Sequence, residues 1–109
     1  GDFKVQDVGN LITKLATDYP FLDAFWSKRL IRAYGLDAWD VLGDAQVPED
    51  LGEAFGATLT AREIRWLIRH EFARGADDIV WRRSKLGLRL TPDQIAHLED
   101  WMQADITKA

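Results

Sequence analysis

The sequence contains no cysteine, and this absence excludes several kinds of chemistry at once. The chain forms no disulfide bond, offers no thiolate nucleophile and has no cysteine ligands for a zinc site. A lack of cysteine fits a protein of a reducing compartment. Long apolar runs are also missing, because no stretch reaches the roughly 20 apolar residues of a membrane-spanning helix. The N-terminus lacks a signal-peptide pattern, so we expect a protein of the cytosolic type.

Histidine and glycine occur at spacings that complete no familiar catalytic motif. His70 and Glu71 begin like the helix of a zinc protease, but the fourth residue after His70 is Arg74 and not a second histidine. Gly52 and Gly56 are four residues apart, yet they follow no expected strand, as a dinucleotide fingerprint or a phosphate-binding loop requires. We therefore predict no catalytic, cofactor-binding or metal-binding residue in this chain.

The composition is that of a folded domain with an uneven distribution of charge. The chain has 109 residues, of which 47% are hydrophobic and 29% are charged, with a net charge of −4. Residues 62–89 hold eight basic and four acidic side chains, so this region carries +4 and the remainder −8. Such asymmetry marks a contact surface or is neutralised between neighbouring helices. Because the chain begins with Gly1 and not methionine, we expect a processed or excised chain.

Apolar residues recur at helical spacing along most of the chain, and no segment alternates with period two for long. We therefore predict an all-α fold, an irregular bundle of five to six helices in a single domain that covers residues 1–109. The expected helices cover residues 7–18, 23–34, 37–42, 60–74, 77–86 and 92 onward. Residues 44–58 are expected to form a loop.

Two capping boxes mark helix starts. In this motif a threonine hydroxyl accepts a hydrogen bond from the amide three residues later, and the side chain of that later residue reaches back. Thr60 with Glu63 and Thr91 with Gln94 both fit the pattern, and the second adds proline at the first helical position. The helix that begins after Thr60 is expected to turn four apolar residues inward: Ile64, Leu67, Ile68 and Phe72.

Two charged residues interrupt these apolar stripes. At about 100° per residue, Arg83 shares a helix face with Ile79 and Leu86. Glu71 lies on the apolar stripe of the helix before it. A buried charge is costly unless it is paired, and arginine binds a carboxylate with two parallel hydrogen bonds. We therefore predict that Glu71 and Arg83 form a largely buried ion pair; an interdomain contact or phosphate binding are the other roles open to Arg83.

The segment around Trp81 is the candidate surface for an external partner. Arg82 and Lys85 point away from the apolar face, and Trp81 is one of five tryptophans, many for a chain of this length. Tryptophans pack between helices, or lie exposed where a partner domain binds. An alternative function uses the same segment, Arg82 to Lys85, in a stand-alone helical module that binds nucleic acid or anions. The overall acidity argues against a nucleic-acid partner.

Residues 73–88 also carry a resemblance to a known family. They resemble the signature Ala-x-Thr-x-x-Asp-x-Leu-x-Arg-Arg-Thr-x-Leu-Gly near the C-terminus of the FAD-dependent, respiratory glycerol-3-phosphate dehydrogenases. Residues 19–35 and 51–73 resemble the opening and the middle of the same C-terminal domain, so the likeness covers almost the whole chain in order. Gly75 and Ser84 depart from the pattern, since threonine is usual at both positions.

The resemblance implies a role within a larger enzyme. That enzyme oxidises sn-glycerol 3-phosphate to dihydroxyacetone phosphate and passes electrons through FAD to membrane quinone. FAD and substrate would be held by a larger N-terminal region outside this chain, so no cofactor or catalytic residue is assigned here. The chain would be a helical accessory domain that packs on the FAD-binding domain of the same polypeptide and is not catalytic alone. The parent enzyme would be cytoplasmic and peripheral on the inner membrane.

Overall fold

The structure is a computed structural model that describes residues 5–83 and 86–108, with side chains for residues 8–81 and 86–107. Within these residues the chain forms five α-helices, and its strands are limited to one short hairpin. The predicted all-α class is therefore confirmed. The chain divides into two compact units, unit 1 (residues 1–51) and unit 2 (residues 52–109), which are described separately. A single domain over residues 1–109 stays a prediction.

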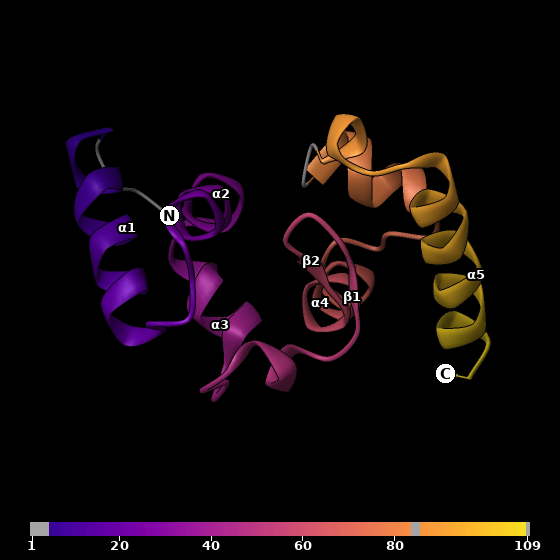
Figure 1. Ribbon diagram of the computed structural model, residues 1–109, viewed down its shortest axis with the longest axis horizontal. Helices are drawn as coiled ribbons and strands as arrows, with labels where there is room; N and C mark the ends of the chain where they lie inside the picture. Colours follow the sequence, from indigo (N-terminus) through magenta and orange to yellow (C-terminus); the bar gives the residue numbers. More distant parts are fainter. Residues whose placement is uncertain (1–4, 84–85, 109) are drawn as a thin grey trace. The chain divides into compact units, whose positions relative to one another are not determined.

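Unit 1 is a small helical cluster in which α1 and α2 pack against each other (Figure 1). Its elements are, in order, α1 (Val5–Asp18), α2 (Ala24–Tyr34), the 3₁₀ turn η1 (Gly35–Asp37), α3 (Ala38–Leu42) and the 3₁₀ turn η2 (Pro48–Leu51). Asp23 caps α2, because its carboxylate accepts a hydrogen bond from the Trp26 amide at 2.7 Å. Gly35 ends α2 at φ 57°, a value that favours glycine. The expected helix boundaries of this unit are confirmed to within two residues.

Unit 2 combines a two-stranded hairpin with helices of three kinds. Its elements are β1 (Ala54–Gly56), β2 (Leu59–Thr60), α4 (Ala61–His70), the π-helix η3 (Asp78–Arg83), the 3₁₀ turn η4 (Gly87–Arg89) and α5 (Pro92–Lys108). The strands are antiparallel, α4 follows directly from β2, and α5 packs against β1. The core of the unit consists of fully buried apolar side chains from these elements: Leu59, Ile64, Leu67, Ile79, Val80, Leu98 and Met102.

The hairpin corrects the prediction that residues 44–58 form a loop. Its strands have three and two residues, too few to produce a period-two pattern in the sequence. Close packing also explains the glycine at the end of β1. Gly56 has φ 123°, and a Cβ atom there would lie 2.5 Å from Leu90 Cδ2 and 2.8 Å from Gln94 Cδ. The side chains of Leu90 and Gln94 therefore occupy the space beside this glycine.

Only one of the two expected capping boxes is present. The Thr91 amide donates to Gln94 Oε1 at 2.8 Å, and the Gln94 amide donates to the Thr91 hydroxyl at 3.1 Å. Thr60 does precede α4, but its side chain makes no capping hydrogen bond. Thr60 is buried at the end of β2, and the Ala61 amide is already satisfied by the Glu53 carbonyl at 2.9 Å. The hairpin therefore satisfies the first amide of α4, and the predicted bond from the Glu63 amide to the Thr60 hydroxyl does not form.

The segment after α4 differs most from the expected helices. α4 ends at His70, four residues before the predicted end, and the expected helix over residues 77–86 is a π-helix in its central part. A π-helix holds more residues per turn than an α-helix, so adjacent residues lie closer together around its axis. This winding fits the burial of both Ile79 and Val80, whose side chains have no exposed surface.

The intact capping box gives a direct test. We expect Thr91→Ala to lower the free energy of unfolding by about 1 kcal/mol, because the Gln94 amide loses its acceptor. Urea denaturation would measure the change. Thr107→Ala is a matched control, since the Thr107 hydroxyl donates only to the Gln103 carbonyl of its own helix, at 2.7 Å. We expect the control to stay within about 0.5 kcal/mol of the parent; equal losses in both variants would contradict the capping role.

Candidate functional site

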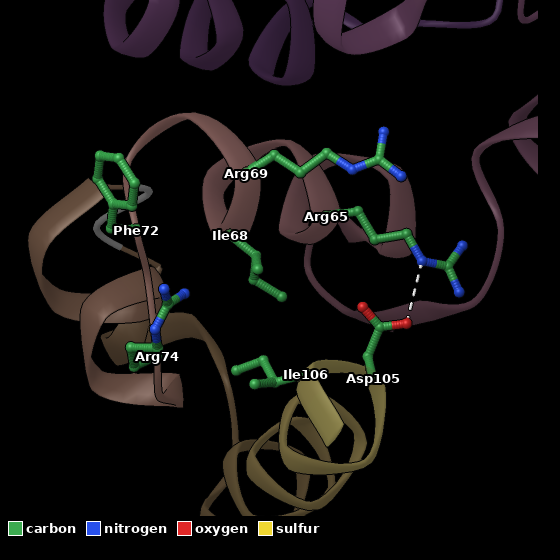
Figure 2. A pocket seen from close by; sticks show the side chains of 7 residues that line it. All are labelled: Arg65, Ile68, Arg69, Phe72, Arg74, Asp105 and Ile106. Carbon is green, nitrogen blue, oxygen red and sulfur yellow. Dashed lines mark hydrogen bonds and ion pairs between the residues drawn. The ribbon is translucent and has the colours of Figure 1, made fainter. Parts of the chain in front are cut away.

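An open groove of about 640 Å³ lies in unit 2 beside α4 and the C-terminal part of α5 (Figure 2). We name it the arginine groove. Three elements of the chain line it, namely α4, the segment that follows α4, and α5. The lining residues are Arg65, Ile68, Arg69, Phe72, Arg74, Asp105 and Ile106.

The floor of the arginine groove is apolar. Figure 2 shows Ile68 of α4 and Ile106 of α5 pointing toward one another across it. Each lies beside a core position of its own helix, because Leu67 precedes Ile68 by one residue and Met102 precedes Ile106 by four. Both isoleucines are half-buried, so the floor is an edge of the unit 2 core that remains open to solvent.

Arg65 closes one side of the groove and joins α4 to α5. Its Nε lies 3.4 Å from Asp105 Oδ1, and its guanidinium lies 5.0 Å from the centre of the Trp101 ring. The pair is partly exposed, so the ionic contact stabilises the fold by about 1 kcal/mol or less. The cation–π contact adds a second tie to the same helix. The guanidinium of Arg65 is therefore occupied by contacts within unit 2.

Arg69 and Arg74 leave hydrogen-bond donors available at the rim. A guanidinium carries five N–H donors. Arg74 Nη1 donates to the Ala73 carbonyl at 3.2 Å, and among the described residues no partner of the Arg69 side chain is found. Both side chains are exposed, and both line the groove. They give the groove a positive rim at two separate points, each of which can bind a carboxylate or another planar anion.

Phe72 corrects the prediction that this residue faces inward. Because α4 ends at His70, Phe72 lies outside the helix, with φ 60° and 72% of its surface exposed. A bulky residue in the left-handed region is an outlier that costs roughly 1–2 kcal/mol. The fold therefore holds a strained phenylalanine at the edge of the groove.

A polar network fixes the segment that carries Arg74. The Ala76 amide donates to Glu99 Oε1 of α5 at 2.8 Å. Gln103 Nε2 donates to Glu99 Oε2 at 2.6 Å and to the Arg74 carbonyl at 2.8 Å. A Cβ atom on Gly75 would lie 3.1 Å from Glu99 Oε1, which is crowded. The glycine at position 75, where the resembling family has threonine, therefore leaves room for the carboxylate that caps this turn.

The predicted ion pair is corrected in one respect. Glu71 is exposed, because α4 ends at His70 and Glu71 no longer lies on the helical stripe. The expected burial of its carboxylate is therefore wrong. The side chain of Arg83 lies outside the described residues, so a pairing between Glu71 and Arg83 stays a prediction.

The predicted interdomain surface is described only at Trp81. That side chain is 51% exposed, and its ring packs on Gly87, where a Cβ atom would lie 2.5 Å from the ring. The Arg82 side chain and all of Lys85 lie outside the described residues, so this surface and its alternative role in binding nucleic acid or anions stay predictions.

The sequence contained a signal for the arginine groove that we did not single out. Arg65 and Arg69 were counted in the basic region, and their spacing of four places them on one helix face. Arg74 was expected inside the same helix, where its position beside the groove could not be foreseen. The groove depends on the early end of α4, which the periodicity did not predict.

A second polar contact in unit 2 joins the hairpin to α5. His97 Nε2 lies 2.6 Å from Glu53 Oε2, and the imidazole stacks on Phe55 with ring centres 5.5 Å apart. Both polar side chains are exposed. Over residues 5–83 and 86–108, no group of three or more histidine, aspartate or glutamate side chains could hold a metal ion. No helix in that part of the chain is long and apolar enough to cross a membrane.

Comparison with known proteins places almost the whole chain in one family. Residues 4–103 match the family described as the C-terminal domain of alpha-glycerophosphate oxidase. The glycerol-3-phosphate dehydrogenase of Pseudomonas aeruginosa is 42% identical over 105 residues, which is 96% of this chain and 20% of that protein. The aerobic glycerol-3-phosphate dehydrogenase of Escherichia coli K12 is 36% identical over 88% of this chain and 19% of its own length.

A third relative has a different name. The D-erythritol 1-phosphate dehydrogenase of Brucella abortus is 33% identical over 101 residues, which is 93% of this chain and 20% of that protein. The chain thus spans about a fifth of the length of the curated relatives that it matches.

The Glu99 network predicts a large effect from one carboxylate. We expect Glu99→Ala to lower the free energy of unfolding by about 1–3 kcal/mol, because it removes the acceptor of the Ala76 amide. Asp100→Ala is the matched control, since Asp100 is an exposed neighbour on the same helix, and we expect it to change stability by less than about 0.5 kcal/mol. Urea denaturation of both variants measures the difference, and equal effects would show that Glu99 caps nothing.

The strain at Phe72 predicts that a smaller residue stabilises the chain. We expect Phe72→Gly to raise the free energy of unfolding by about 0.5–1 kcal/mol, because glycine adopts positive φ without a steric penalty. Phe72→Leu keeps the strain and serves as the control, with little change expected. Thermal and urea unfolding would measure both variants. A loss of stability in Phe72→Gly would mean that the ring contributes to the core after all.

Proposed function

Because the chain belongs to the family of C-terminal domains of alpha-glycerophosphate oxidase, we propose that it is the helical accessory domain of an FAD-dependent glycerol-3-phosphate dehydrogenase. One observation carries the proposal. Relatives named as glycerol-3-phosphate dehydrogenases match 88–96% of this chain but only about a fifth of their own length. A segment that recurs at this scale in such enzymes is one domain of the enzyme.

The proposed reaction converts the secondary alcohol of sn-glycerol 3-phosphate to the ketone of dihydroxyacetone phosphate. The substrate loses two electrons and two protons in this step. FAD would accept the electrons and membrane quinone would receive them next. We propose that the parent enzyme is cytoplasmic and works on the cytoplasmic face of the inner membrane, where such a quinone is within reach.

The described residues of this chain do not fit a flavin site. Gly52 precedes β1 of an antiparallel hairpin and Gly56 ends this strand, whereas a dinucleotide fingerprint joins a parallel strand to a helix. The space beside Gly56 is filled by Leu90 and Gln94, so a pyrophosphate has no room there. We therefore place FAD and the reacting atoms in the rest of the polypeptide and derive no step of the oxidation from this chain.

The role that remains is to pack on the flavin domain and support it. The relative named D-erythritol 1-phosphate dehydrogenase carries a similar segment over 93% of this chain, although its named substrate is a longer polyol phosphate. A domain shared between enzymes with different named substrates supports a structural role. On this proposal, residues of the parent outside this chain determine which polyol phosphate is oxidised.

The proposal is tested with the complete parent protein and with residues 1–109 alone. We expect the parent to show flavin absorbance and to reduce a soluble quinone analogue only when glycerol 3-phosphate is present. The 109-residue chain should show neither property. Unphosphorylated glycerol is the substrate control, and D-erythritol 1-phosphate tests the substrate class. Turnover by the 109-residue chain, or a parent without flavin, would overturn the proposal.

A further inference from the structure

We propose that the arginine groove docks an acidic segment with an apolar side chain that belongs to the remainder of its own polypeptide. The inference rests on the proposed function, since it takes the chain as one domain of a longer enzyme. It adds the surface through which that domain is held, and this surface differs from the one predicted at Trp81, Arg82 and Lys85.

The charge of the groove defines the first property of its partner. Three arginines line the groove against one aspartate, and Asp105 is already paired with Arg65. The positive charges of Arg69 and Arg74 remain, on planar groups whose donors match the two oxygens of a carboxylate. The partner is therefore expected to present at least one aspartate or glutamate to this rim.

The floor of the groove defines the second property. Ile68 and Ile106 face one another, and Phe72 lies exposed at the edge. A small inorganic anion bound at Arg69 and Arg74 would leave this apolar surface in contact with water. A polypeptide segment that carries an aliphatic or aromatic side chain next to its carboxylate satisfies both the rim and the floor.

The backbone around Phe72 indicates that the surface is formed in advance. Phe72 is held at φ 60° with its ring in solvent, an arrangement that does not stabilise unit 2 by itself. Glu99 and Gln103 fix the adjacent segment through Ala76 and Arg74. A surface that is already ordered loses little conformational entropy on binding. Aromatic and arginine side chains are also the residues that carry most binding energy at interfaces.

The length of the relatives favours a partner in the same polypeptide. Each relative is about five times as long as the part that this chain matches. A partner on the same chain is present at an effective concentration in the millimolar range, so a modest surface is sufficient to keep two domains docked. Contacts between domains of one chain are typically more polar than those of permanent complexes, as the arginine rim requires.

Hydroxyl-radical footprinting of the complete parent protein tests the docking surface, with oxidation of the Phe72 ring as the readout. We expect Phe72 to be oxidised about tenfold more slowly in the parent than in the 109-residue chain, a ratio that corresponds to about 1.4 kcal/mol. The double variant Arg69→Glu with Arg74→Glu should remove this protection in the parent. Trp81 is read in the same samples and reports on the other predicted surface.

The matched control reverses the same amount of charge on α2. Lys28→Glu with Arg32→Glu changes two exposed residues of α2, and Phe72 should stay protected in that variant. Arg69→Lys with Arg74→Lys keeps the charge and should retain most of the protection. Far-ultraviolet circular dichroism checks that each variant is folded. Equal loss of protection in the lysine and glutamate variants, or loss in the α2 control, would overturn charge complementarity at the groove.

Three further outcomes would also overturn the inference. Equally fast oxidation of Phe72 in the parent and in the 109-residue chain, while the parent oxidises glycerol 3-phosphate, would leave the proposed function standing and refute the docking surface. Protection of the 109-residue chain that increases with its own concentration would assign the groove to a second copy. Protection that requires added nucleic acid or inorganic phosphate would assign it to those ligands. A parent without activity would refute the proposed function and leave the docking surface to be tested, since footprinting needs no turnover.

Discussion

The carboxylate of Glu99 determines how the chain passes from α4 to η3. After His70 the backbone leaves the helix. The amides of Glu71 and Ala73 still donate to the Leu67 carbonyl of α4, at 2.9 and 3.3 Å, whereas the Ala76 amide needs an acceptor outside α4. Glu99 reaches across from α5 to accept from Ala76, while Gln103 donates both to Glu99 and to the Arg74 carbonyl. Two side chains of α5 therefore help to set the position of a connecting segment that has no regular structure of its own.

The features that make unit 2 distinctive depend on this arrangement. A Cβ atom at position 75 would lie 3.1 Å from Glu99 Oε1, so the glycine leaves room for this carboxylate, and the same anchoring holds Arg74 at the groove. It also leaves Phe72 outside both the helix and the core, at positive φ. If α4 had continued to Arg74, Phe72 would have remained on the helical stripe and the arginine rim would have been spread around a helix. The irregular segment thus concentrates charge and apolar surface in one place.

Helix positions were largely predictable because local rules determine them. Thr91 caps its helix as the sequence indicates, and the apolar stripes of α1, α2 and α5 have helical spacing. Thr60 makes no capping bond; it is buried at the end of β2, where the neighbouring Ala61 amide donates to the Glu53 carbonyl. The hairpin and the end of α4 depend on such long-range contacts, so the groove could not be derived from periodicity. Arg65 and Arg69 were visible as a pair, whereas the place of Arg74 was not.

The polar groups discussed in unit 2 fall into two sets: those that hold the unit together and those that can bind a partner. The polar contacts at Glu99 and between Arg65 and Asp105 join elements of unit 2 to each other, so these groups are already occupied. The donors left over belong to Arg69 and Arg74, beside an apolar floor and a strained aromatic ring. A surface of this composition is suited to hold another polypeptide, because it offers charge and apolar area together but no nucleophile or metal ligand set. If the chain is one domain of a longer enzyme, as proposed, such a surface serves the boundary between domains.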